Sequence, residues 1–232
     1  MMKFHPDKCQ VLSVTKNKRP IIKSYSLHSH TLEHVTSAKY LGVTITSDLK
    51  WENHIRNICL KANKTIGFLK RNLNISNSDI KEKAYISLVR PTVEYASALW
   101  DPHLQKDKHK LEMVQRISAR YVTNRYRNRS SVSDMIDQLN WTSIEERRKN
   151  ARLTMLYKIN SHEVNVAASH KLIPPDRISR NMSKNSFQIP QCKSTTRKES
   201  FYPQTIRDWN ALPNTVTYVS SLESFKRLLT NK

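Results

Sequence analysis

The stretch Lys39-Tyr40-Leu41-Gly42-Val43-Thr44-Ile45 is a short strand-forming run that leads into a long basic helix, predicted to begin near Asp48. Valine, isoleucine, threonine and tyrosine favour strands because their side chains pack well on a pleated surface. Residues 9–15 have a similar composition, and residues 21–34 alternate weakly between apolar and polar. We therefore predict a small antiparallel β element over residues 1–47, followed by helices.

From residue 48 to about 162 the apolar residues recur mostly at helical spacing. The first helix, capped by Ser47 or Asp48, has an apolar stripe made of Ile55, Ile58, Cys59, Ala62, Ile66 and Leu69. Further helices are expected from Ser76 or Ser78 to Trp100 with a kink at Pro91, over 106–126, over 131–139, and from a capping box at Thr142-Ser143-Ile144-Glu145 to about Ser161. The predicted fold class is mainly α with a small N-terminal β element (α+β), and residues 48–162 form a helical bundle.

The spacing also predicts which side chains of the later helices point inward. In the kinked helix these are Ile80, Ala84, Leu88, Tyr95, Leu99 and Trp100. In the helix over 106–126 they are Leu111, Val114, Ile117 or Ser118, Tyr121 and Val122, and in the helix that ends near Ser161 they are Leu153, Leu156, Tyr157 and Ile159. Buried aromatic residues at helical spacing usually belong to a core, so we expect Trp51, Trp100 and Trp141 to pack inside rather than to stack on bases.

The composition changes after this bundle. Residues 163–200 are rich in Ser, Asn, Lys and Pro, which indicates a linker that is partly irregular. Residues 201–232 carry Trp209, Leu212, Phe225, Leu228 and Leu229, and a Ser220-x-x-Glu223 box precedes the last apolar group. We expect this last segment to be helical.

The charge points to a polyanionic partner. Lys and Arg total 40 against 19 Asp and Glu in 232 residues, which gives a net charge of +21. The excess is spread over every part of the chain, and a globular, basic protein of this kind most often binds nucleic acid, whether RNA, DNA or their hybrid. The oligomeric state stays open.

The remaining composition bears on location and on enzyme class. Cys9, Cys59 and Cys192 are far apart and odd in number, which favours a reducing compartment over a disulfide framework. No apolar run is long enough to span a bilayer and no secretory signal is visible, so we expect a cytoplasmic or nuclear protein without a membrane. With Gly42 and Gly67 as the only glycines, a glycine-rich phosphate loop is excluded.

Short motifs occur in a fixed order along nearly the whole chain. They are Phe4-His5-Pro6-Asp7-Lys8-Cys9, Lys39-Tyr40-Leu41-Gly42-Val43, Leu49-x-Trp51-x-x-His54-Ile55, Gly67-Phe68-Leu69-Lys70-Arg71-Asn72-Leu73, Leu88-Val89-Arg90-Pro91-x-x-Glu94-Tyr95-Ala96, Leu99-Trp100-Asp101-Pro102, Leu111-Glu112-x-Val114-Gln115-Arg116, Glu146-Arg147-Arg148-x-x-Ala151-Arg152-Leu153 and Trp209-Asn210-x-Leu212-Pro213. Each alone is weak, but the ordered set is specific. It resembles the region downstream of the palm catalytic site in reverse transcriptases of non-LTR retrotransposons, of the jockey and chicken-repeat type.

The resemblance implies roles for two N-terminal groups of residues. Lys8 matches a lysine that acts as a general acid toward the departing pyrophosphate in a complete polymerase, although position 5, His here, is commonly Asn in the family. The alternative is a surface lysine at a strand edge. Tyr40, Leu41 and Gly42 match the primer grip, where a tight hairpin presses against the primer end, and the alternative is an ordinary buried strand.

The resemblance also implies a nucleic-acid surface on the helices. In a thumb-like bundle the first helix follows the template and primer backbone, and the residues placed there are Lys61, Lys64, Lys70 and Arg71. A second cluster, which would bind element RNA or target DNA, comprises Arg116, Arg120, Arg125, Arg127 and Arg129. Contacts of this kind go mainly to phosphates and do not read sequence. For each cation, a solvated helix face is the competing interpretation.

Several kinds of catalysis lack their residues. Phosphoryl transfer by a polymerase needs two neighbouring carboxylates for two metal ions, and the sequence has no Asp-Asp dipeptide. Magnesium would belong to a palm site outside this chain, so no cofactor is expected here. His28, His30 and His34 could meet Cys9 across a hairpin, but ordinary surface histidines are the simpler interpretation and no metal site is predicted.

Three hypotheses for function therefore stay open. The chain is the C-terminal portion of a retrotransposon RNA-directed DNA polymerase that binds primer-template without catalysing synthesis on its own, or a non-catalytic basic helical module that binds nucleic acid independently, or a decayed element copy without function.

Overall fold

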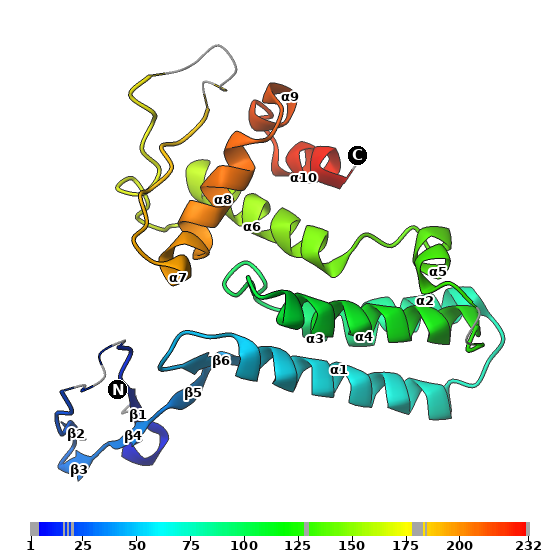
Figure 1. Cartoon of the computed structure of the whole chain (residues 1–232), viewed down its shortest axis with the longest axis horizontal. Helices are drawn as coiled ribbons and strands as arrows, with labels where there is room; N and C mark the ends of the chain where they lie inside the picture. Colours follow the sequence, from blue (N-terminus) through cyan, green and yellow to red (C-terminus); the bar gives the residue numbers. More distant parts are fainter. Residues whose placement is uncertain are drawn as a thin grey trace.

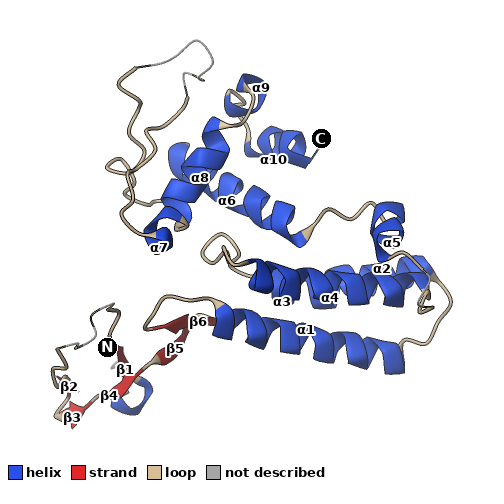
Figure 2. Ribbon diagram, viewed as in Figure 1, coloured by secondary structure: helices blue, strands red, loops and turns tan. Residues whose placement is uncertain are grey.

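The computed structural model describes residues 5–15, 17, 19, 21–127, 130–177, 183 and 185–230. Within these ranges the chain is mainly helical, with small two-stranded sheets near its N-terminus (Figure 1, Figure 2). The predicted α+β class is confirmed. The strands extend from the start of the first long helix, and the helices after residue 143 lie on the other side of the central helices.

The N-terminal segment pairs its strands in three separate sheets. A 3₁₀ turn, η1 (Pro6–Lys8), precedes the strands β1 (Gln10–Leu12), β2 (Ser26–Leu27), β3 (His30–Thr31), β4 (Glu33–Val35), β5 (Ser37–Tyr40) and β6 (Val43–Thr46). The β2–β3 and β5–β6 pairs are antiparallel, as predicted. The β1–β4 pair is parallel, because the chain between these two strands makes its own hairpin and returns in the original direction.

The central body consists of helices packed along α1 (Glu52–Asn72). They are α2 (Ser78–Ala84), the π-helical turn η2 (Tyr85–Val89), α3 (Arg90–Glu94), α4 (Gln105–Thr123) and α5 (Val132–Gln138). Helices α1 and α4 run in the same direction, since Glu52 pairs with Lys106 at one end and Lys70 lies over the Tyr126 ring at the other. The predicted stripe of α1 is confirmed, with Ile58 half-buried and the other five residues buried.

The beginning of α1 differs from the prediction. Asp48 accepts hydrogen bonds from the Thr46 hydroxyl at 2.7 Å and from the Lys50 amide at 3.1 Å, so it closes a turn and does not cap a helix. These bonds, that of Thr46 above all, lower the pKa of the exposed Asp48 carboxyl to about 2. The helix begins four residues later, at Glu52.

The kinked helix of the prediction is shorter than expected. Pro91 sits in the first turn of α3, where its missing N–H costs nothing, and the helix ends at Glu94. The π-helical turn also rotates the inward face of the residues in η2 and α3, while Tyr95 and Leu99 lie beyond the end of the helix. Tyr85, Val89 and Val93 are buried, whereas Ile80, Leu88, Tyr95 and Leu99 are 47–60% exposed, so the predicted inward set was wrong except for Trp100 and the half-buried Ala84.

The C-terminal body is formed by α6 (Ile144–Asn160), α7 (Thr195–Lys198), α8 (Phe201–Asn210), α9 (Asn214–Thr217) and α10 (Leu222–Thr230). Ser143 caps α6 by accepting from the Glu146 amide at 3.1 Å, one residue later than predicted, and Ser221 accepts from the Ser224 amide at 3.2 Å in the same way. Among the described residues, none between 163 and 194 is in a helix or strand, whereas α7 lies inside the segment 163–200 that was predicted to be a partly irregular linker.

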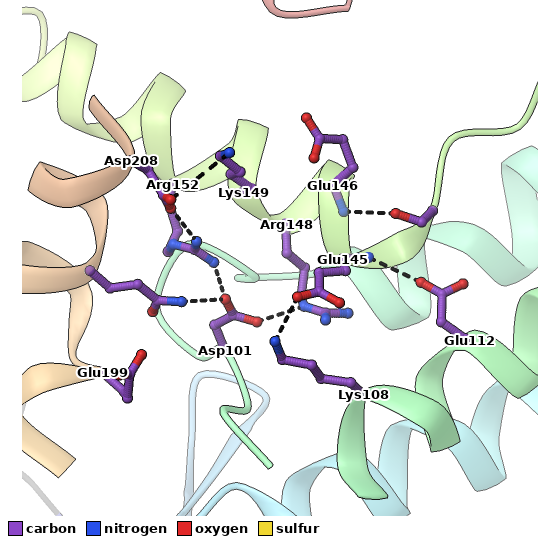
Figure 3. Close-up of polar contacts among 12 residues, drawn as sticks. Asp101, Lys108, Glu112, Glu145, Glu146, Arg148, Lys149, Arg152, Glu199 and Asp208 are labelled. Carbon is purple, nitrogen blue, oxygen red and sulfur yellow. Dashed lines mark hydrogen bonds and ion pairs between the residues drawn. The ribbon is translucent and has the colours of Figure 1, made fainter. Parts of the chain in front are cut away.

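The two larger hydrophobic clusters of the described residues divide the molecule, and the division falls inside α6. Ile144 belongs to the cluster built on α1 and α4, whereas Leu153, Leu156 and Tyr157 belong to the cluster with Trp209 and Phe225. The two clusters are joined by buried ion pairs at Asp101, in the loop before α4 (Figure 3). Helix α6 is therefore shared between both bodies.

Candidate nucleic-acid interface

The β5–β6 hairpin presents the predicted primer-grip residues at an exposed tip. Tyr40 pairs with Val43, which leaves Leu41 and Gly42 as a two-residue turn. Both have positive φ, 45° and 86°, as a type I′ turn requires. Tyr40 is 68% and Leu41 73% exposed, so these residues do not lie in a buried strand.

Tyr95 holds this hairpin tip in place. Its hydroxyl donates to the Leu41 carbonyl at 3.0 Å, and its ring carbon Cε1 lies 3.2 Å from the position that a Cβ on Gly42 would occupy. The Tyr95 carbonyl accepts in turn from Trp100 Nε1 at 2.9 Å, and Trp100 is fully buried. Tyr95 was predicted to point into a helix core, but its actual role depends on a contact across 54 residues that no local pattern signals.

A buried histidine connects the hairpin to α1. Nδ1 of His54 accepts from the Thr44 amide at 3.3 Å, and its ring packs edge-on against Trp100 with centroids 4.9 Å apart. An accepting Nδ1 requires the neutral ring, and burial lowers the pKa of His54. The histidine therefore works as an uncharged link between β6 and α1.

One exposed face of α1 displays cations. At 100° per residue, Lys61, Lys64 and Arg71 lie within about 80° of one another, on the side opposite the buried stripe. All three are exposed, and none of them forms an ion pair with another described residue. We call Lys61, Lys64 and Arg71, together with Lys70, the α1 cation face.

Two apolar side chains lie among these cations. Leu60 and Phe68 are both 55% exposed and fall on the same side of α1 as Lys64. Phe68 was not among the predicted site residues, although its position off the apolar stripe distinguishes it from the core residues of α1. An exposed aromatic ring between basic side chains is a surface suited to a sugar or base next to a bound phosphate.

The α1 cation face continues to the end of the neighbouring helix α4. Lys70 Nζ lies 5.2 Å from the centre of the Tyr126 ring, and Arg125 and Arg127 on either side of Tyr126 are exposed. The chain turns here at Asn124, whose φ is 57° and whose side chain accepts from the buried Lys81. The two groups of cations predicted separately therefore meet at one end of the α1–α4 pair.

The other predicted cations are placed differently. Arg116 and Arg120 are half-buried on α4, so they are less accessible than the cations after Asn124. Arg129 lies outside the described residues. Lys8 is exposed at the end of η1, and among the described residues no hydrogen bond or ion pair joins it to the hairpin tip.

Trp141 packs against the helical bundle, and His28, His30 and His34 are exposed in the N-terminal segment. Trp141 is half-buried, stacks on Tyr85 with centroids 4.3 Å apart and donates to Glu82 Oε1 at 2.7 Å. No group of three metal-ligating side chains occurs in the described part of the chain, and His34 Nε2 contacts the Lys23 carbonyl at 2.8 Å. A search of the described helices found none long and apolar enough to cross a membrane.

Comparison with known proteins gave no match: no family model, no curated protein and no solved structure is similar to this chain.

Proposed function

We propose that this chain is a nucleic-acid-binding module that grips the sugar–phosphate backbone, and that it corresponds to the primer-grip, thumb and C-terminal region of a non-LTR retrotransposon reverse transcriptase. The observation that carries the proposal is the α1 cation face, which lacks ion-pair partners in the described chain and continues into Arg125 and Arg127.

The chemistry of this face suits a phosphate backbone. When exposed lysines and arginines without carboxylate partners bind phosphates, counterions that were condensed on the nucleic acid are released. This release drives binding with little sequence preference. From Lys61 to Arg71 the helix rises about 15 Å, which is long enough for several phosphates at the ~3.4 Å rise of one duplex strand. The face is therefore large enough to track one strand of a duplex.

The ordered motifs support the reverse-transcriptase origin. The Tyr40-Leu41-Gly42 turn, matched to a primer grip, is a tight hairpin with an exposed tip directly before the basic helix. The chain contributes no paired aspartates, and synthesis would depend on a palm supplied elsewhere. The expected role of this chain is to hold primer and template, and a primer-extension assay of the chain alone with Mg²⁺ should yield no product.

The binding can be tested by fluorescence anisotropy with a labelled blunt RNA–DNA hybrid at several salt concentrations. Lys61→Gln/Lys64→Gln should reduce the affinity about tenfold or more near 0.1 M salt and lower the slope of log K against log salt by about 1.8. These two residues point away from the core, so the circular dichroism spectrum should be unchanged.

The matched control is Lys193→Gln/Arg227→Gln, which removes two exposed positive charges from the C-terminal body and so gives the same net charge. The control should retain most of the affinity. Salt-independent binding by the native chain, or equal losses in the two double variants, would contradict the proposal.

A further inference from the structure

A groove crosses the junction of the two helical bodies, away from the α1 cation face. Its volume is about 540 Å³, and its floor is α6, which lies between α3 on one side and α10 on the other (Figure 1). Small and polar residues form the floor: Asn150, Ala151 and Thr154. Since the apolar side of α6 turns toward α8 and α10, this strip of the helix is left uncovered.

Cations lie at both ends of the groove. Arg90 and Arg147 stand at one end, and Lys158 and Lys226 at the other. Glu94 is the one carboxylate among the described lining residues, and it is already shared by both arginines through their Nε atoms. The groove therefore carries four positive charges against one negative charge.

The cations differ in whether their charged groups are free to bind a ligand. Arg147 is engaged by Glu94, by the Thr142 carbonyl and by Gln115 Oε1 at 2.8 Å, so it is a fixed part of the wall. Lys158 and Lys226 form no ion pair with any described residue. Arg90 is held to Glu94 through its Nε, so the two lysines are the binding groups without a counter-charge, and they come from different helices that pack against each other.

We propose that this groove binds the backbone of one extended strand of nucleic acid, as a second site separate from the α1 cation face. Its length along α6 from Arg147 to Lys158 is about 17 Å, which sets an upper limit of about five phosphates at the ~3.4 Å rise of a stacked strand and accommodates fewer of an extended one. Its volume is in the range of sites that enclose small ligands, so a single strand enters and a duplex does not.

The lining favours nucleic acid over an acidic peptide. The hydroxyl and amide side chains of Ser97, Asn150 and Thr154 are of the types that bond phosphate and sugar oxygens. Peptides that dock in grooves rely on apolar anchors, and Met155 and Leu229 are the large apolar residues of the described lining. Among those lining residues none is aromatic, so bases are not stacked and the site should tolerate any sequence.

The test compares two probes on the full chain: a short labelled oligouridylate and the blunt RNA–DNA hybrid. Lys158→Gln/Lys226→Gln should reduce affinity for the oligouridylate about tenfold and lower its salt slope by about 1.4, because two contacts to a single strand are lost. Affinity for the hybrid should change less than twofold. Lys158→Arg/Lys226→Arg should restore oligouridylate binding, since arginine also binds phosphate.

The control Lys193→Gln/Arg227→Gln removes the same charge, and Arg227 is the exposed neighbour of Lys226 outside the groove lining. The proposal is overturned if this control weakens oligouridylate binding as much as Lys158→Gln/Lys226→Gln does, or if the latter weakens both probes equally. Displacement of the oligouridylate by polyglutamate of equal charge, at equal concentration, would overturn it in favour of an acidic peptide. Failure of the α1 cation face would instead appear in the Lys61→Gln/Lys64→Gln variant with the hybrid, so the two proposals fail separately.

Discussion

Helices α1 and α6 contain the same number of lysines and arginines, five each, but they use them in opposite ways. In α1 all five cations are exposed, and Lys61, Lys64 and Arg71 lie opposite a continuous apolar stripe. In α6 the Arg148 and Arg152 side chains are only 0% and 4% exposed and pair with Asp101, and Arg152 also pairs with Asp208 at 2.8 Å (Figure 3). The same residue types thus form an exposed basic surface on α1, whereas on α6 they join the two helical bodies through buried ion pairs.

The difference follows from what each helix has to cover. Helix α1 meets one hydrophobic cluster, so a single stripe faces inward and the rest of the helix is free for cations. Helix α6 packs against two hydrophobic clusters on different sides. Between these clusters it contacts the loop that contains Asp101. Arg148 and Arg152 can be buried because the carboxylates of Asp101 and Asp208 lie beside them in the folded chain.

Removal of Asp101 should produce the largest effect on stability. In Asp101→Ala the guanidinium of Arg148 would remain buried without its carboxylate, and loss of one partner of a buried ion pair costs about 3–5 kcal/mol. Nη1 and Nη2 of Arg148 already have no partner among the described residues, which leaves no other acceptor to replace Asp101. Urea denaturation measures the change.

The comparison supplies the control for that experiment. Lys61→Ala on the exposed face of α1 should change the free energy of unfolding by no more than about 0.5 kcal/mol, as is usual for surface substitutions. If Asp101→Ala lowers the free energy of unfolding by less than about 1 kcal/mol, the buried ion pairs at Asp101 do not stabilise the fold. The contrast drawn between α1 and α6 would then be wrong.

The pH dependence of stability probes the buried side of α1. His54 has its pKa lowered by burial from the ordinary 6.5, so the unfolded chain binds a proton more readily than the folded one. The contribution is fully present above pH 6.5 and is lost as the pH falls from 6.5 toward the folded pKa, at no more than ~1.4 kcal/mol per pH unit for one group. Protonation of Nδ1 would also remove the acceptor of the Thr44 amide.

This dependence can be assigned with His54→Asn, whose side-chain oxygen can take the place of Nδ1 but does not titrate. Chemical denaturation between pH 5 and pH 7 (about the range in which histidine changes charge) should show a shallower loss of stability in His54→Asn than in the native chain. Equal pH slopes in the two proteins would mean that His54 is not the titrating group.

Gly67→Ala should stabilise the protein, by less than the loss expected for Asp101→Ala. Gly67 lies inside α1, and a Cβ there would meet only Arg71 Nη1 at 3.5 Å, an ordinary contact. Alanine in place of glycine inside a helix stabilises by about 0.5–1 kcal/mol, so the melting temperature should rise.

The matched substitution is Gly42→Ala in the hairpin turn. There φ is +86° and a Cβ would lie 3.2 Å from the Tyr95 ring, so alanine should destabilise the protein instead of stabilising it. Stabilisation in both variants would mean that Tyr95 does not fix the hairpin tip.

The predictions from the sequence were most accurate for helical segments that pack against a single hydrophobic cluster. The stripe of α1, the inward residues of α4 and those of the C-terminal half of α6 were confirmed, because each of these segments packs mainly on one cluster and its apolar residues therefore recur at a regular spacing. The inward face was wrong at Leu88, where a π-helical turn that no residue type signals shifts the spacing by a residue, and at Tyr95 and Leu99, because the helix ends at Glu94. The start of α6 was displaced by one residue because Thr142 and Ser143 are equally good caps, whereas α1 begins after a turn closed by Asp48 and has no side-chain cap.

The candidate site divides in the same way. The exposed cations of α1 were identified from the sequence, since they fall off the apolar stripe. Their meeting with Arg125 and Arg127, the Tyr95 contact to the hairpin tip and the groove over α6 join residues far apart in the chain. Local spacing carries no information on such contacts.

By itself the sequence determined the helical character, the order of the elements, the strong positive charge and the exposed face of α1, because each of these depends on composition or on a local period. Only the tertiary structure decided which arginines are exposed and which are buried, since that depends on where Asp101 and Asp208 lie after folding. Buried charge is stable only beside its counter-charge, and the folded chain brings Asp101 within 2.8 Å of an arginine 47 residues away.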